Sequence, residues 1–180
     1  MDGIISKRYG RAMFELAKTE NKIEEYLKQL RVIKDITIEN PKLLEMFDHP
    51  KVTIFEKFTL IDDLFKDGFD KEVRDFLKLL VTKDRINYIV GMIQDYEELY
   101  YEYMNIVVVS VTSAVELDEE EKSALMIKLE GLFEKKVIID QKTDPAIIGG
   151  LRIAALDKVI DATVKGRLEK VRQNLLQEVR

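Results

Sequence analysis

The sequence predicts an α+β protein, with an N-terminal six-helix bundle at residues 1–104 followed by a small C-terminal αβ domain at residues 105–180. Over the first hundred residues, apolar side chains recur at spacings of three and four, which is typical of amphipathic helices. From residue 105 the pattern changes to a continuous β-branched run, residues 105–112, which indicates a buried strand. No Gly/Ser/Pro-rich linker separates the halves, so we expect the second domain to follow the last helix directly.

The first domain is expected to hold five long helices and one short helix. Asn40 and His49 each precede a proline, which disfavours the α conformation, so both mark breaks. The short helix is placed between Pro41 and Phe47, and Asp67-Gly68 marks a turn. Short connections of this kind favour antiparallel neighbours. The predicted apolar faces are Ile5, Tyr9, Ala12, Met13 and Leu16; Ile23, Tyr26, Leu27, Leu30 and Ile33; Ile54, Phe58, Ile61 and Phe65; Val73, Phe76, Leu77 and Leu80; and Ile86, Ile89, Val90, Ile93 and Tyr96.

In the second domain, a helix is expected to follow the strand at residues 105–112. Asp118 is placed at its N-cap, with Glu121 three residues later as the partner in a capping box. Residues 137–139 are expected to form another strand. The apolar face predicted for the helix consists of Leu125, Leu129, Leu132 and Phe133.

The stretch from Thr143 to Leu168 contains a turn, a double glycine and the start of a helix. Asp144-Pro145 indicates the turn, because proline presets φ and cannot donate a backbone hydrogen bond. Gly149-Gly150 allows backbone conformations closed to other residues, or a close approach to a neighbouring element. Residues 151–155 and 158–160 are predicted to form a hairpin. Asp161 is then placed at a helix N-cap, followed by an apolar face of Val164, Leu168, Val171 and Leu175.

Composition argues against several classes of function. The chain has 29 Lys and Arg against 34 Asp and Glu, and its basic residues do not cluster, so a nucleic-acid partner is not expected. The longest apolar runs are too short to span a bilayer, so direct membrane insertion is not expected. The absence of cysteine excludes disulfides, thiol catalysis and cysteine-ligated metals. The start of the chain has no signal-peptide core, which favours a bacterial-type cytoplasm.

No catalytic constellation is evident, and neither an enzymatic activity nor a cofactor or metal is expected. His49 is the only histidine, and it precedes a proline in an expected loop. Gly149-Gly150 lacks the spacing of a Walker loop or a dinucleotide-binding loop, and a predicted strand follows it. A small nucleotide-binding enzyme built on this αβ unit is therefore the less favoured alternative.

Two helices of the first domain are more apolar than a bundle surface requires. Phe14 and Ala17 widen the apolar face of the first helix, and Gly10 would let another helix approach it closely. Two such helices side by side would form a hydrophobic groove for an amphipathic helix. A central helix with no partner, or a generic helical adaptor, is consistent with the same pattern. The excess in the helix at residues 73–81 comes from Phe76, Leu77, Leu79, Leu80 and Val81.

Two motifs together resemble the delta subunit of F-type ATP synthase, a family that includes the mitochondrial oligomycin-sensitivity-conferring protein. The first lies at residues 8–17, and the second comprises Asp144-Pro145, residues 148–150, residues 161–164 and Arg167-Leu168. With the matching length, the resemblance covers essentially the whole chain. This sequence departs from the common family pattern at Gly10, Leu156 and Thr163, where alanine, glycine and serine are usual.

The resemblance implies a non-catalytic stator connector that ties the catalytic head to the peripheral stalk, so that proton-driven rotation is coupled to ATP synthesis. The first and fifth helices would receive the N-terminal helix of the alpha subunit. The C-terminal domain would bind the C-terminal region of the b-type stalk subunit. The protein would lie peripherally at the cytoplasmic face of the cell membrane as part of the complex. The residues implied for the helix-binding groove are Tyr9, Ala12, Met13, Leu16, Phe76, Leu79 and Leu80.

Overall fold

The computed structural model describes residues 2–155 and 158–169, and it confirms the mixed α+β class. The chain divides into two compact units, Met1–Tyr100 and Tyr101–Arg180. The division falls inside a single helix, α6 (Ile89–Tyr103), so the second unit begins within the last turn of that helix.

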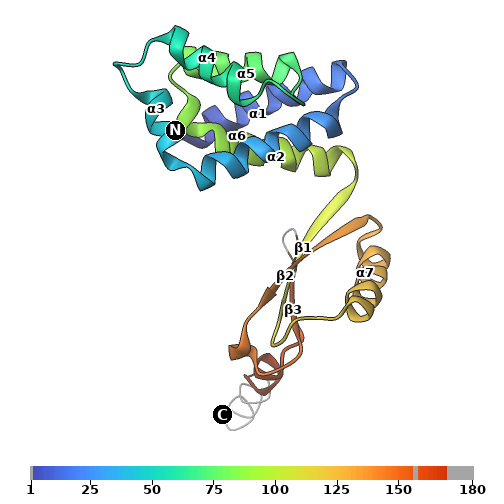
Figure 1. The fold of residues 1–180 in the computed structure, drawn as a ribbon. Coiled ribbons are helices and arrows are strands. Elements are labelled where there is room, and N and C mark those ends of the chain that lie inside the picture. The colour runs from blue at the N-terminus through green and yellow to red at the C-terminus, as the bar shows by residue number, and fades with distance from the viewer. Residues whose placement is uncertain (1, 156–157, 170–180) are drawn as a thin grey trace. The chain divides into compact units, whose positions relative to one another are not determined.

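The helical unit consists of helices joined by short connections (Figure 1). Proline ends one helix and begins the next, because α2 stops at Glu39 and α3 starts at Pro41. The helix α4 starts at a capping box in which Thr53 and Glu56 exchange hydrogen bonds. The elements are α1 (Asp2–Thr19), α2 (Ile23–Glu39), α3 (Pro41–Asp48), α4 (Ile54–Leu64), α5 (Lys71–Thr82), the 3₁₀ turn η1 (Ile86–Tyr88) and α6.

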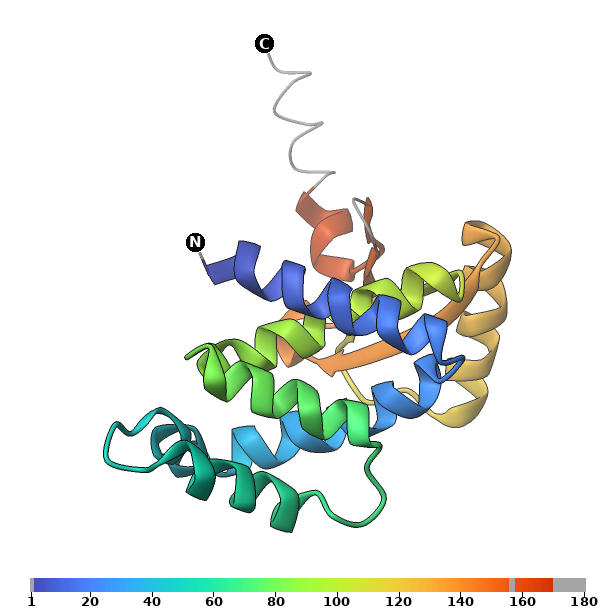
Figure 2. The same cartoon turned by 90° about the horizontal axis from the view of Figure 1, so that it is seen from above.

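Figure 2 shows α1 and α6 running in the same direction and α5 running in the opposite direction. Gly10 makes the close packing of α1 on α6 possible. A Cβ atom at this position would lie 2.7 Å from the carbonyl oxygen of Met92 and 2.9 Å from the Cβ of Asp95. The expectation that Gly10 admits another helix is therefore confirmed, and the helix is α6. Gly91 on α6 likewise allows a close approach to α1, because a Cβ atom there would lie 2.8 Å from the Ser6 hydroxyl oxygen.

The core of the helical unit is formed by side chains from all of its helices. Tyr96 is fully buried, and its hydroxyl donates a hydrogen bond to the carbonyl oxygen of Ile23 at 2.9 Å. Phe14 packs edge-on against the Tyr96 ring, with ring centroids 5.4 Å apart. The sequence prediction was wrong for Ile54, which is 55% exposed because it is the first residue of α4 and points away from the core.

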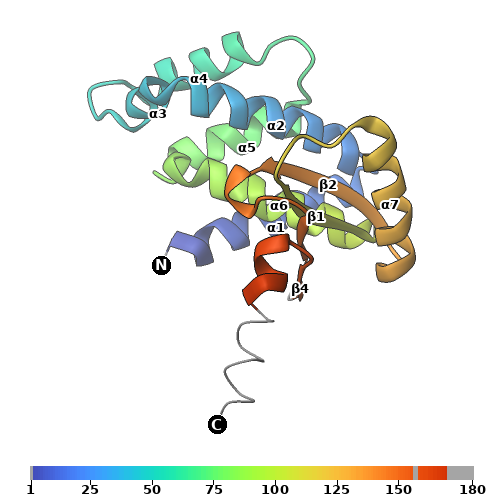
Figure 3. The same ribbon diagram turned by 90° about the horizontal axis from the view of Figure 1, so that it is seen from below.

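The αβ unit is built on a four-stranded sheet of order β2-β1-β3-β4. β1 pairs in parallel with β2, and β3 pairs antiparallel with both β1 and β4. The helix α7 connects the two parallel strands and lies beside them (Figure 3). The predicted strands and hairpin are confirmed. The elements are β1 (Ile106–Ser113), α7 (Glu119–Phe133), β2 (Lys136–Thr143), the 3₁₀ turn η2 (Pro145–Ile147), β3 (Leu151–Ala155) and β4 (Lys158–Asp161).

The start of α7 matches the sequence prediction, but its apolar face does so only in part. The Asp118 carboxylate accepts a hydrogen bond from the Glu121 backbone at 2.7 Å, and the Glu121 side chain accepts one from Asp118 at 3.2 Å. Leu129 is the buried centre of the face. The inclusion of Leu132 was wrong, because it lies about 60° around the helix from Leu129 and is 60% exposed.

Gly150 is required where the hairpin meets the start of the last helix. Its φ is +82°, and a Cβ atom there would lie 2.4 Å from the carbonyl oxygen of Ala162. The N-cap prediction for Asp161 was wrong, because that residue ends β4 in register with Arg152. The cap is Thr163, whose hydroxyl oxygen accepts a hydrogen bond from the Gly166 backbone at 2.9 Å. The helix begins at residue 164.

The Asp161 carboxylate instead supports the cap. It accepts hydrogen bonds from the backbone N–H of Thr163 at 2.9 Å and from the Thr163 hydroxyl at 2.7 Å. The Leu156-Asp157 turn and the predicted apolar positions Val171 and Leu175 lie outside the described residues. Within the described part of the chain, no helix is both long and apolar enough to cross a membrane.

Candidate functional site

A groove of about 540 Å³ lies between α1 and α5. Six of the seven residues that the sequence analysis singled out line it. They belong to helix rows spaced by three and four residues, so each helix presents one continuous apolar edge to the groove. The residues that line it are Tyr9, Ala12, Met13, Leu16, Phe76 and Leu79, together with Arg8, Glu72 and Asp75.

The groove has a buried floor and exposed walls. Met13 is only 2% exposed and Phe76 is 9% exposed, so both are anchored in the core beneath the groove. Leu16 is 38% exposed and Leu79 is 45% exposed, and they form apolar walls that meet solvent. The floor residues thus belong to the core as well as to the groove. A partner that covers these walls would remove apolar surface from water at about 25 cal/mol per Å².

Leu80, the seventh predicted residue, does not line the groove. It is fully buried within the core of the helical unit. Leu80 points about 100° away from Leu79 around the helix, and in this direction it enters the core instead of bordering the groove. The assignment of Leu80 to the groove is therefore corrected, and the residue contributes to the stability of the unit instead.

The sequence analysis missed the three charged residues of the groove. Arg8 lies four residues before Ala12, Glu72 lies four residues before Phe76, and Asp75 lies four residues before Leu79. Each therefore shares a helix row with an apolar wall or floor residue. Extending the apolar rows by one turn in each direction would have identified them.

A network of polar contacts fixes the N-terminal end of α5 beside the turn between α1 and α2. Lys22 forms an ion pair with Asp70, and the Gln29 side chain donates to the other Asp70 oxygen at 2.6 Å. These two hydrogen bonds hold the pKa of Asp70 below its ordinary value. Two residues after Asp70, Glu72 accepts a hydrogen bond from the Tyr26 hydroxyl at 3.4 Å.

Burial raises the pKa of Tyr26, and the nearby carboxylates of Glu72 and Asp70 raise it further. The phenol therefore remains a protonated hydrogen-bond donor at neutral pH. A neutral donor thus positions the carboxylate of Glu72 at the edge of the groove.

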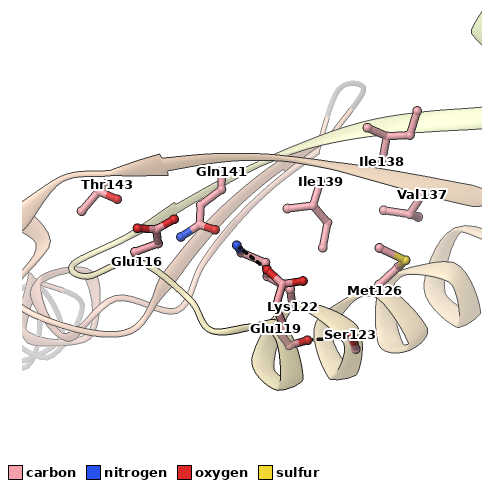
Figure 4. Close-up of a pocket in the computed structure, with 10 residues that line it drawn as sticks. All are labelled: Glu116, Glu119, Lys122, Ser123, Met126, Val137, Ile138, Ile139, Gln141 and Thr143. Atoms are coloured by element: carbon pink, nitrogen blue, oxygen red, sulfur yellow. Dashed lines mark hydrogen bonds and ion pairs between the residues drawn. The ribbon is translucent and has the colours of Figure 1, made fainter.

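A second cleft, of about 660 Å³, lies between α7 and β2 in the αβ unit (Figure 4). Glu119, Lys122 and Ser123 are bonded to one another, whereas the buried Nε2 of Gln141 has no hydrogen-bond partner among the described residues. Lys122 pairs with Glu119 at 3.1 Å, and the Ser123 hydroxyl donates to the Glu119 carbonyl oxygen at 2.7 Å. The Ser123 hydroxyl thus has no general base beside it in this arrangement.

Among residues 2–155 and 158–169, no group of three or more His, Cys, Asp or Glu side chains is placed to hold a metal ion. The arrangement of the α1–α5 groove, which is apolar with a few charged residues at its edges, suits the binding of an amphipathic helix.

A family model and individual relatives point to the same protein family. The family model for the ATP synthase delta (OSCP) subunit matches residues 5–175. The ATP synthase subunit delta of Clostridium perfringens (strain 13 / Type A) is 38% identical over 173 residues, which is 96% of this chain and 97% of that protein. The subunit delta of Clostridium kluyveri (strain NBRC 12016) is 32% identical over 173 residues, covering 96% of both proteins.

A solved structure is similar in fold. It is a chain in the cryo-EM structure of the Toxoplasma gondii mitochondrial ATP synthase hexamer, with a TM-score of 0.71 and 16% sequence identity. The match covers 95% of this chain and 97% of the other. At this identity the likeness concerns the fold.

Proposed function

The chain belongs to the ATP synthase delta (OSCP) subunit family, and we propose that its α1–α5 groove binds the N-terminal helix of the alpha subunit of the catalytic head. As a delta subunit, it is a non-catalytic component of the peripheral stalk of F-type ATP synthase. The helices α1–α6 would correspond to the six-helix N-terminal domain of the family. The stator role then consists of joining the head to the stalk, so that rotation is coupled to ATP synthesis.

The observation that carries this proposal is the groove itself. Its exposed walls, Leu16 and Leu79, stand beside a floor that the core already holds in place. An amphipathic helix that inserts one apolar stripe would cover both walls without rearranging the unit. A stator must resist sustained load, which requires slow dissociation, and burial of apolar walls against a fixed floor favours a low off-rate.

The second unit would bind the C-terminal region of the b-type stalk subunit. In the described residues α7 packs on one face of the sheet through Leu129, and the other face carries Val108 at 39% exposure and Ile138 at 40%. These half-exposed apolar side chains are available for a partner. As part of the membrane-associated complex, the protein would lie peripherally at the cytoplasmic face of the cell membrane.

Calorimetric titration of the full chain with a peptide of the cognate alpha-subunit N-terminus tests the groove. We expect saturable one-to-one binding with a negative heat-capacity change, because apolar surface is buried. Leu79→Asp should weaken binding at least about tenfold, because it places a charge in the apolar contact. Ile38→Asp is the matched control, since Ile38 is 58% exposed on α2 and does not line the groove.

Two results would contradict this assignment. Equal weakening by Leu79→Asp and Ile38→Asp would place the peptide outside the groove. Equal affinity for unrelated amphipathic peptides would favour the generic adaptor. A thermal-shift titration with ATP and Mg²⁺ addresses the enzyme alternative, because a specifically bound nucleotide would raise the melting temperature with concentration. We expect no such rise.

A further inference from the structure

The charged residues of the groove are ordered along its length. Two acidic residues, Glu72 and Asp75, line the groove from α5. The first turn of α5 contacts the start of α2 through the Lys22–Asp70 ion pair and through the hydrogen bond from Tyr26 to Glu72. Since α1 ends at Thr19, Glu72 lies beside the C-terminal half of α1, where Leu16 forms the wall. Asp75 follows Glu72 by one turn on the same edge of α5.

One basic residue, Arg8, lines the groove from the N-terminal half of α1. The helix α6 packs on this half of α1 through the Ser6–Gly91 and Gly10–Met92 contacts. The chain between α5 and α6 is short, comprising residues 83–88, so the C-terminal end of α5 lies near the same half of α1. Figure 2 shows the resulting opposite directions of α1 and α5. Arg8 therefore lies toward the end of the groove where Leu79 forms the wall.

These three charges are available to a partner. Of the described residues, none forms an ion pair with Arg8, Glu72 or Asp75. The other described residues that line the groove are uncharged. The groove thus has an acidic half and a basic end on an otherwise apolar surface.

We propose that this charge order sets the direction in which the docked helix lies. The inference rests on the proposed helix-binding function and deepens it. The partner is an amphipathic helix whose apolar stripe is accompanied by basic side chains toward one end and acidic side chains toward the other. The basic end lies beside Glu72 and Asp75, and the acidic end lies beside Arg8.

The physical reason is that an apolar stripe alone distinguishes the two directions poorly. Leucine-like side chains spaced by three and four residues present a similar ridge when a helix is reversed. Opposite charges at the ends are matched in only one direction, and the reversed helix places like charges together. Ion pairs at the edge of the groove are individually weak, and we expect the three together to give a preference of about tenfold, which corresponds to about 1.4 kcal/mol.

The test measures the direction of bound peptides on the full chain. Two designed peptides share the same leucine stripe and composition, but one carries lysines near its N-terminus and glutamates near its C-terminus, and the other has the reverse order. The chain has no cysteine, so Glu20→Cys and Lys83→Cys each provide a unique labelling site. Glu20 follows α1 at the acidic end, and Lys83 follows α5 at the basic end. A donor dye on each cysteine and an acceptor dye on the peptide N-terminus report the direction, because energy transfer is greater for the dye pair that lies closer together.

We expect the two peptides to bind in opposite directions, with the lysine end near the label at position 20 in both cases. The triple variant Arg8→Glu/Glu72→Lys/Asp75→Lys should reverse both, and salt near about 1 M should reduce the preference. Binding of both peptides in the same direction, or an unchanged direction in the triple variant, would overturn the inference while leaving the groove as a helix-binding site. No binding by either peptide or by the alpha-subunit peptide would instead overturn the proposed function.

Discussion

The helical unit and the αβ unit differ in how their apolar side chains are distributed. Of the described residues, twenty buried apolar side chains form the core of the helical unit, whereas seven form the core of the αβ unit. In the αβ unit, large apolar residues such as Ile127 and Leu132 on α7 are 70% and 60% exposed. Burial of apolar side chains therefore contributes more to the stability of the helical unit. We expect the stability of the αβ unit to depend more on single backbone positions.

This difference indicates where each unit is sensitive to substitution. In the helical unit an exposed wall residue of the groove can change without loss of the fold, because the core behind it is extensive. The neighbouring leucines of α5 allow this to be tested directly, since Leu79 is exposed and Leu80 is fully buried. In the αβ unit we expect the largest sensitivity at Gly150, where the backbone approaches Ala162 closely.

The largest expected effect is that of Leu80→Asp. An unpaired charge in the core costs several kcal/mol, which is comparable with the stability of a small domain, so the helical unit should unfold. Circular dichroism should show a large loss of helix. Leu79→Asp is the matched control and should retain the helical signal while losing peptide binding. Retention of helix by Leu80→Asp would mean that the core is less closed than its burial indicates.

Gly150→Ala should be the most damaging small substitution in the αβ unit. The left-handed φ of +82° and the approach of 2.4 Å to the Ala162 carbonyl oxygen together should cost about 2–4 kcal/mol of unfolding free energy. Urea denaturation of the full chain would measure the loss. Gly149→Ala is the neighbouring control, because its Cβ would make only an ordinary contact of 3.5 Å with Val164. Equal effects at the two positions would argue against the tight contact.

Gly10→Ala probes the packing of α1 on α6 with a single methyl group. The contact with the Met92 carbonyl oxygen would force the helices apart, and the helix preference of alanine offsets about 1 kcal/mol of the cost. We expect a net loss of about 1–2 kcal/mol, read as a lower melting temperature. Gly3→Ala should not lower stability, because nothing lies within 4 Å of its added Cβ. A Gly10→Ala protein as stable as the Gly3→Ala protein would contradict the close approach.

The smallest expected effect concerns acid sensitivity of the helical unit. Burial alone would raise the pKa of Glu97, but hydrogen bonds from Arg31 at 2.6 Å and Lys34 at 3.0 Å outweigh it and hold the pKa below its ordinary value. The stabilisation is therefore complete above the ordinary glutamate pKa of 4.5 and is lost as the pH falls through the lower pKa of the folded state.

Glu97→Gln should lower stability by about 1 kcal/mol at neutral pH. It should also flatten the decline of the melting temperature below about pH 5. The exposed neighbour Glu98 provides the control Glu98→Gln. If both variants show the same pH profile as the unmodified chain, the ion pairs of Glu97 contribute nothing measurable.

Much of the local structure followed from the sequence because its causes are local. The proline at position 41 begins a helix, the Asp118 and Glu121 pair caps α7, and the β-branched run at residues 106–109 lies in β1. Six of the seven groove residues were also identified, since apolar rows at helical spacing and the family resemblance point to the same edges of α1 and α5. Their role in binding remains a prediction.

Three features could not be read from the sequence, because they depend on contacts between distant segments. Both Leu79 and Leu80 were assigned to the groove, and only the packing of α5 shows that Leu79 borders it and Leu80 does not. Asp161 and Thr163 are both acceptable caps, and the pairing of β4 with β3 occupies Asp161 and leaves the cap to Thr163. The ordering of Arg8 and Glu72 along the groove depends on the antiparallel arrangement of α1 and α5.

The sequence by itself determined most of the helices and strands, because capping, proline geometry and apolar periodicity act over a few residues. The tertiary structure alone decided which of two adjacent leucines borders the groove, which residue caps the last helix and how charges are ordered along the groove. These outcomes require the positions of segments that are remote in the chain, and no short-range pattern encodes them.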